Sequence, residues 1–125
     1  MDITPPVAAD RQLIQGYGDG GFRVSGVRYS GSIIVFPWET VPWPVVAGDN
    51  FTVEQFGAIR DAENEVSVLL LGCGAKASLI GTELRVQVRD WGVVIEAMDT
   101  GAACRTYNVL LSEDRFVAAA LIAIE

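Results

Sequence analysis

The chain has 125 residues, of which 16 are acidic and 9 are basic, so its formal net charge at pH 7 is −7. This length suits one domain with a sizeable core that needs no metal or disulfide for stability. The acidic balance excludes nucleic acid as a partner, because such a surface repels phosphate groups.

The sequence contains no histidine, which is the commonest metal ligand and the usual general base near neutral pH. We therefore expect no metal site, no cofactor and no catalytic set. The two cysteines, Cys73 and Cys104, are too few for a disulfide framework. We interpret them as reduced, partly buried thiols of a cytosolic protein rather than as a functional pair.

Residues 1–12 are predicted to form a loose leader, which Pro5 and Pro6 stiffen. The leader shows neither the pattern of a signal peptide nor that of a transit peptide. The longest uncharged apolar run, residues 116–124, is much shorter than the roughly 20 residues of a membrane helix. We expect a cytoplasmic protein with one domain over residues 13–125 and no direct membrane insertion.

Short β-type runs separated by glycines occupy residues 13–36. A turn signal at residues 17–21 and the glycines Gly26 and Gly31 divide these runs. The strongest run, residues 32–36, is β-branched and uncharged, which indicates a strand buried on both faces.

Three prolines then interrupt residues 37–45 and predict an irregular loop that crosses the surface. The loop carries Trp38 and Trp43, which are the candidates for partner binding. Aromatic side chains held by prolines are rigid apolar anchors with a low entropic cost of binding. The alternative is that the two rings cover the core as a lid.

The next segments predict a helix, a strand and a second helix. Thr52 begins a capping-box pattern that predicts a helix over residues 53–63. Residues 66–71 read as a buried strand that ends at glycines. Residues 84–88 fit a strand by alternation, or a helix face together with Trp91. We choose the helix, because a parallel crossover between strands needs about a dozen residues.

The last third of the chain predicts strand, helix and strand. Residues 93–97 form the first strand, and Asp99 or Thr100 caps a helix that ends near Ser112. Residues 116–124 are apolar throughout and are predicted to form a central strand. The sequence shows no internal repeat, so the whole pattern is that of an α/β domain.

Three segments carry a resemblance to the domain-of-unknown-function 498 family. They are GSIIVFP followed by Trp43, then VSVLLLGCG, and above all residues 92–121, from Gly92 to Leu121. The resemblance implies a single three-layer α/β domain with a mixed central sheet of about five strands flanked by helices. It also implies an additional β element from the N-terminal half, and it favours a place in the core for Trp43.

The family includes a mitochondrial respiratory complex I assembly factor, an adipogenesis-associated protein and many bacterial and archaeal members. This chain is similar to the bacterial type. The resemblance implies a non-enzymatic interaction or assembly factor, whose protein partner belongs to a membrane respiratory complex or its assembly machinery. The uncharged final strand leaves room for a homodimer.

The alternative function is a small-ligand-binding protein or an enzyme, with a cleft at the carboxyl ends of the predicted strands. The candidate residues for this cleft are Gly72, Cys73, Gly74, Glu96, Met98, Thr100, Thr106 and Asn108. A glycine turn between strand and helix can present backbone N–H groups to an anion. Glu96 would be the natural general base if the protein were an enzyme.

Each cleft candidate also has a purely structural explanation. The glycine turn can simply need a positive φ angle, and backbone N–H groups, Arg105 or Arg115 can pair with Glu96. Thr106 and Asn108 are mediocre helix formers, which indicates that each has a partner. That partner could be a ligand, or a neighbouring loop that Asn108 ties to the helix.

Overall fold

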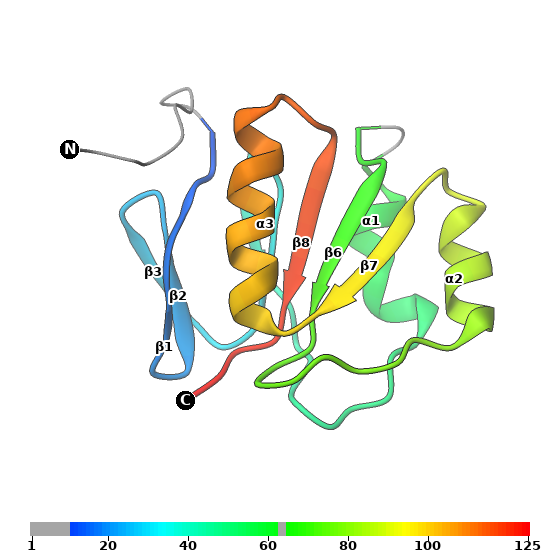
Figure 1. Ribbon diagram of the computed structural model, residues 1–125, viewed down its shortest axis with the longest axis horizontal. Coiled ribbons are helices and arrows are strands. Elements are labelled where there is room, and N and C mark those ends of the chain that lie inside the picture. Colours follow the sequence, from blue (N-terminus) through cyan, green and yellow to red (C-terminus); the bar gives the residue numbers. More distant parts are fainter. Residues whose placement is uncertain (1–10, 63–64) are drawn as a thin grey trace.

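The computed structural model describes residues 11–62 and 65–125 and confirms a single α/β domain (Figure 1). It contains a three-stranded sheet, in the order β1-β2-β3, and a five-stranded mixed sheet, in the order β5-β4-β8-β6-β7. The strands are β1 (Ile14–Gly18), β2 (Gly21–Val24), β3 (Val27–Ser30), β4 (Ile33–Val35), β5 (Thr40–Pro42), β6 (Val68–Gly72), β7 (Val94–Met98) and β8 (Val117–Leu121). The helical segments are η1 (Val53–Phe56), α1 (Gly57–Arg60), α2 (Thr82–Arg89) and α3 (Thr100–Ser112).

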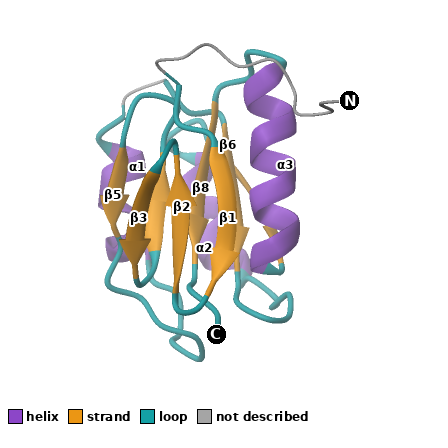
Figure 2. Cartoon of the chain, turned by 90° about the vertical axis from the view of Figure 1, so that its left-hand side faces the viewer, coloured by secondary structure: helices purple, strands orange, loops and turns teal. Residues whose placement is uncertain are grey.

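The elements form three layers around the five-stranded sheet. One face of this sheet packs against η1, α1 and α2, and the other face packs against α3 and the small sheet. The small sheet lies beside α3, with β1 nearest to the helix (Figure 2). This third layer contains the N-terminal β element that the sequence predicts.

The small sheet is an antiparallel meander joined by two tight turns. Asp19 and Gly20 connect β1 to β2 with φ angles of 53° and 76°, and Ser25 and Gly26 connect β2 to β3 with φ angles of 45° and 85°. Two successive positive φ angles are the mark of type I′ turns, whose twist matches that of the flanking strands. The turn predicted at residues 17–21 is therefore confirmed as the connection between β1 and β2.

Strand β8 lies at the centre of the large sheet, as predicted. It pairs with β4 in the antiparallel direction and with β6 in the parallel direction, and all five of its residues are buried. The strand is shorter than the predicted range of residues 116–124: Phe116, with a 64% exposed side chain, lies before it, and residues 122–124 lie after it.

The irregular loop predicted for residues 37–45 is partly wrong, because it contains strand β5. This strand pairs with β4 along the edge of the large sheet, with Pro42 opposite Ile33. An edge strand accepts proline because one side of its backbone needs no partner. The prolines therefore limit the strand to three residues without preventing it.

The helix predicted over residues 53–63 is also corrected. The structure divides it into a 3-10 turn, η1, and the short helix α1, which begins at Gly57 and ends at Arg60. Gly57 at the junction favours helix weakly. The capping pattern is present in part, because the Thr52 N–H donates to Gln55 Oε1 at 3.0 Å. Residue 63 lies outside the described residues.

Helix α2 confirms the choice made for the ambiguous segment. Leu84 and Val88 are buried at a helical spacing, whereas Val86 between them is 55% exposed. A strand would place all three side chains on one face. The helix connects the parallel strands β6 and β7, as the crossover argument requires.

Candidate functional site

The carboxyl ends of the parallel strands β6, β7 and β8 meet at one edge of the large sheet (Figure 1). Gly72 at the end of β6 is paired with Met98 of β7 and with Leu121 of β8. Ligands of open α/β sheets bind at this edge. Most of the predicted cleft residues belong to the strand ends and turns found here.

Thr100, the first residue of α3, is fully buried and joins three of these segments. Its Oγ1 donates to the Ile122 carbonyl at 2.7 Å and accepts from the Gly74 N–H at 3.0 Å. Its own N–H donates to the Gly74 carbonyl at 2.8 Å. The threonine hydroxyl is therefore engaged within the fold.

The glycine turn after β6 has a packing role as well. A Cβ on Gly72 would lie 3.0 Å from Thr100 Cα and 3.0 Å from Leu121 Cδ2, which is too close for an ordinary contact. The N–H of Cys73 donates to the Met98 carbonyl at 2.8 Å. Helix α2 begins only at Thr82, so its N-terminus does not directly follow the turn. The anion-binding arrangement expected from the sequence has its N–H groups of Cys73 and Gly74 bonded internally.

Asn108 on α3 holds strand β1. Its Oδ1 accepts from the Ile14 N–H at 3.0 Å, and its Nδ2 donates to the Ile14 carbonyl at 2.7 Å. The neighbouring Tyr107 is fully buried and its hydroxyl donates to the Gln12 carbonyl at 2.8 Å. Burial raises the pKa of Tyr107 well above its ordinary value. The partner of Asn108 is thus strand β1 of the N-terminal sheet, where the sequence suggested a ligand or a neighbouring loop.

The remaining cleft candidates lie apart from one another. Glu96 is exposed on the edge strand β7, opposite Leu70 of β6. Met98 is half-buried and packs in the core on the α3 side of the sheet, and Thr106 is half-buried on α3. Neither Glu96 nor Thr106 lines a cavity that the structure gives in its described residues.

The two cysteines are free and buried on opposite faces of the large sheet. Cys104 packs on the α3 side, where burial raises the pKa of its thiol from 9.0 to about 12, against the smaller opposing effect of Arg105. A thiol with so high a pKa is a poor nucleophile at neutral pH. Cys73 lies on the other side, next to a cavity.

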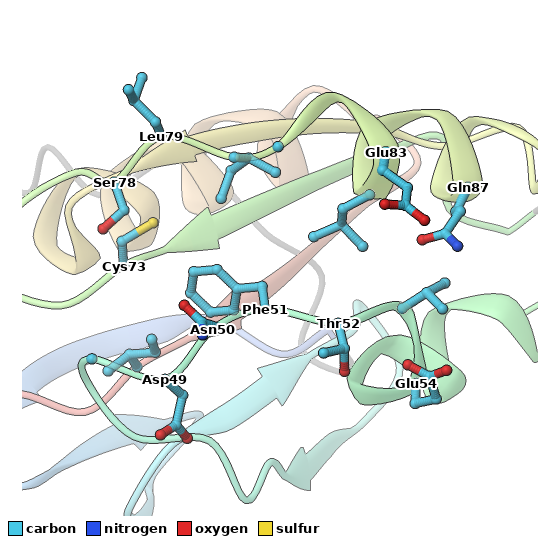
Figure 3. Close-up of a pocket in the computed structure, with 16 residues that line it drawn as sticks. Asp49, Asn50, Phe51, Thr52, Glu54, Cys73, Ser78, Leu79, Glu83 and Gln87 are labelled. Carbon is cyan, nitrogen blue, oxygen red and sulfur yellow. The ribbon is translucent and has the colours of Figure 1, made fainter.

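This cavity, of about 640 Å³, lies at the carboxyl edge of the large sheet (Figure 3). It separates the segment of residues 48–54 from the segment of residues 78–87, and Cys73 and Ile122 lie at the strand ends between them. The side chain of Phe51, from the first segment, lies in the space between the two. Glu83 and Gln87 extend from α2 on the side opposite Thr52 and Glu54. Of the eight cleft residues predicted from the sequence, Cys73 alone lines it.

Sequence reasoning missed the other residues of this cavity. The polar ones are Asp49, Asn50, Thr52, Glu54, Ser78, Glu83 and Gln87. One available signal was the position of residues 75–81, which follow a buried strand and precede a helix at the edge where ligands bind. The other segment, residues 48–54, gives no such signal, because only the tertiary fold brings it here.

A second, smaller groove of about 220 Å³ lies at the opposite, amino-terminal ends of β6 and β8. It is lined by Arg11, Pro37, Trp38, Glu65, Leu111, Asp114, Arg115 and Phe116. Trp38 is 41% exposed and stacks on Phe36, with 5.0 Å between ring centroids. Trp43, the other predicted anchor, is only 3% exposed, and its Nε1 donates to the Gln55 carbonyl at 2.8 Å.

Within residues 11–62 and 65–125, no group of three or more Cys, Asp or Glu residues is placed to hold a metal ion. None of the helices in the same part of the chain is long and apolar enough to cross a membrane.

The three layers and the mixed sheet define a class of small α/β proteins, and the sequence places the chain within one family of this class. Residues 14–122 match the model of the family described as a protein of unknown function, DUF498/DUF598. The chain belongs to this family.

Three similar proteins illustrate its range. The chain is 37% identical over 122 residues to an uncharacterised protein of Rhodobacter capsulatus, covering 98% of this chain and 93% of that one. It is 34% identical over 122 residues to the NADH dehydrogenase (ubiquinone) 1 alpha subcomplex assembly factor 3 of Danio rerio, covering 98% of this chain and 70% of the factor. A crystal structure from Bartonella henselae, described as an outer membrane protein, is 38% identical with a TM-score of 0.85 and covers 94% of this chain and 98% of its own.

Proposed function

We propose that this chain is a non-enzymatic assembly factor, which binds a protein partner during the formation of a membrane respiratory complex. One observation carries the proposal: the relative in Danio rerio is named an assembly factor of NADH dehydrogenase, and its similarity extends over 98% of this chain. An assembly factor acts by holding a partner and needs no catalytic set. In this proposal the protein works from the cytoplasm.

The groove around Trp38 is the surface that we assign to the partner. Trp38 and Phe116 line the groove with exposed apolar area, and the stacking of Trp38 on Phe36 holds the indole in place. Aromatic side chains fixed in this way are typical centres of protein interfaces. Arg11 and Arg115 together with Glu65 and Asp114 supply charges of both signs around them.

A capture experiment tests this function. The tagged protein is recovered from gently solubilised source cells, and the proteins that accompany it are quantified by mass spectrometry. We expect enrichment of respiratory complex I subunits or of membrane-insertion machinery. Recovery of the protein alone would count against the assembly function.

A variant of the groove tests the proposed surface separately. Trp38→Ala should abolish the enrichment, because the loss of a central aromatic anchor commonly costs about 2 kcal/mol or more of binding energy. Val109→Ala is the control, since Val109 is 49% exposed on α3 and lies outside the groove. Circular dichroism checks that both variants fold. Equal capture by the two variants would show that the partner binds elsewhere.

The alternative of a ligand cleft or enzyme site at Gly72–Gly74, Glu96 and Asn108 has less support. Asn108 and the turn N–H groups make internal hydrogen bonds, and Glu96 is exposed away from the cavity. A screen of metabolites by thermal melting addresses it, because a ligand at 100 times its Kd adds about 2.7 kcal/mol of stability.

A further inference from the structure

The cavity at the carboxyl edge is separate from the partner groove and has the size of a small-molecule site. Cys73 and Ile122, directly after β6 and β8, line the cavity, whereas Phe116, directly before β8, lines the groove. Its volume of about 640 Å³ lies in the usual range of ligand pockets, about 300–1,000 Å³. An inference about this cavity therefore goes beyond the proposed assembly function.

One part of the cavity wall is apolar and is fixed by the core. Phe51 stacks on Trp43 with 6.3 Å between ring centroids and also packs against Phe56. Leu84 and Ile122 are buried residues of the core that face the same space. This wall exists without a ligand, so a ligand with an apolar part would bind it without first ordering the protein.

The charge of the cavity is acidic. Asp49, Glu54 and Glu83 line it, and no basic residue does. In the described part of the chain the one salt bridge joins Arg60 to Asp61, so none of the three carboxylates is paired with a cation. Arg85, on the same helix as Glu83, donates instead to the Ile95 carbonyl at 2.7 Å.

Acidic and amide side chains lie on both sides of the cavity, beside its apolar part. Glu83 and Gln87 extend from α2 on one side, and Glu54 with Thr52 lies on the other (Figure 3). Oxygen acceptors on both sides suit an ammonium or guanidinium group, which is a donor only.

We propose that this cavity binds a small organic cation, a primary amine or guanidinium on an apolar stem. The cationic group lies between Glu54 and Glu83, and the stem packs on Phe51 and Leu84. An anion of the same shape is excluded by the three carboxylates.

Three probes of nearly equal shape test the ligand class. Phenethylamine carries the cation, 2-phenylethanol is its neutral counterpart, and 3-phenylpropionate is its anionic counterpart. Each is titrated into the protein while backbone amide shifts are followed by NMR. We expect saturable shifts at residues 48–54 and 78–87 with the amine alone. Equal shifts with the alcohol would show that the cavity binds the apolar part without recognising the charge, which would overturn the proposal. The absence of a saturable shift with the amine would also overturn it.

A double variant tests the carboxylates. Glu54→Gln with Glu83→Gln should weaken amine binding about tenfold, the effect of losing charge-assisted hydrogen bonds. Glu39→Gln with Glu113→Gln removes the same charge outside the cavity and should bind like the original chain. Trp38→Ala should also keep amine binding. The result of the capture experiment therefore does not decide whether the cavity binds an amine. Unchanged binding by the Glu54 and Glu83 double variant would contradict the assignment.

Discussion

The hydroxyl of Thr100 connects the end of β6, the start of α3 and the chain after β8 through buried hydrogen bonds. Thr100→Val keeps the branched shape but leaves the Gly74 N–H and the Ile122 carbonyl without these bonds. We expect a loss of about 2 kcal/mol in the free energy of unfolding, the cost of leaving such groups unsatisfied. Urea unfolding followed by circular dichroism measures it.

The control for this prediction is Thr82→Val. Thr82 is exposed at the start of α2, where Gly81 is the N-cap residue, so the substitution should change stability by less than about 0.5 kcal/mol. Equal stability of the two variants would mean that water replaces the Thr100 hydroxyl.

The sequence indicated a partner for Asn108 but could not name it, and it gave Thr100 only as a helix cap or a cleft residue. Asn108 bonds to a residue 94 positions away, and Thr100 bonds to residues 26 and 22 positions away. A polar residue in an apolar segment indicates that a hydrogen bond exists. Whether a ligand or the backbone completes that bond depends on tertiary contacts, which the local pattern does not contain.

Among the elements, the small sheet depends on α3 for its position. Asn108 bonds to both backbone groups of Ile14 in β1, and the Tyr107 hydroxyl bonds to Gln12 just before it. Asn108→Leu removes the first pair of bonds. We expect amide hydrogen exchange in β1, β2 and β3 to become about tenfold faster, since about 1.4 kcal/mol corresponds to a factor of ten.

Exchange in β6 and β8 is the internal reference for this prediction, because these strands lie in the centre of the large sheet. Their slow amides should change much less than those of the small sheet. Val109→Leu, at an exposed position on the same helix, serves as the control variant. Uniform acceleration in both sheets would show that the small sheet does not open as a separate unit.

The strength of each local signal explains which elements were predictable. Strands β6 and β8 are nearly continuous apolar runs, and α3 has an N-cap at Asp99 that accepts from the Ala102 N–H at 2.9 Å. Strand β5 was missed because its prolines suggest a loop, and only its edge position allows them. The predicted burial of Phe56 and Ile59 is confirmed, but the split into η1 and α1 falls at Gly57, which favours helix weakly.

At the scale of the whole molecule, the two ends of the parallel strands carry different surfaces. The amino ends carry the groove with Trp38 and Phe116, and the carboxyl ends carry the acidic cavity with Glu54 and Glu83. From the sequence, Trp38 beside Pro37 was a candidate for partner binding, but the groove itself was not predicted. The sequence could not indicate the cavity, because two segments that are far apart in the chain form it.

The acidic balance of the molecule predicts how its stability depends on salt. The net charge is −7, and the described residues contain one salt bridge, between exposed side chains, so repulsion among carboxylates outweighs pairing. Raising the ionic strength from about 0.01 M to about 0.15 M shortens the Debye length from about 30 Å to about 8 Å and screens this repulsion. The free energy of unfolding should therefore rise by roughly 1 kcal/mol, the scale of surface charge interactions, as measured by urea unfolding. Glu54→Gln with Glu83→Gln removes two negative charges and should make the increase smaller. A decrease in stability with added salt would instead show that attraction between charges dominates the folded protein.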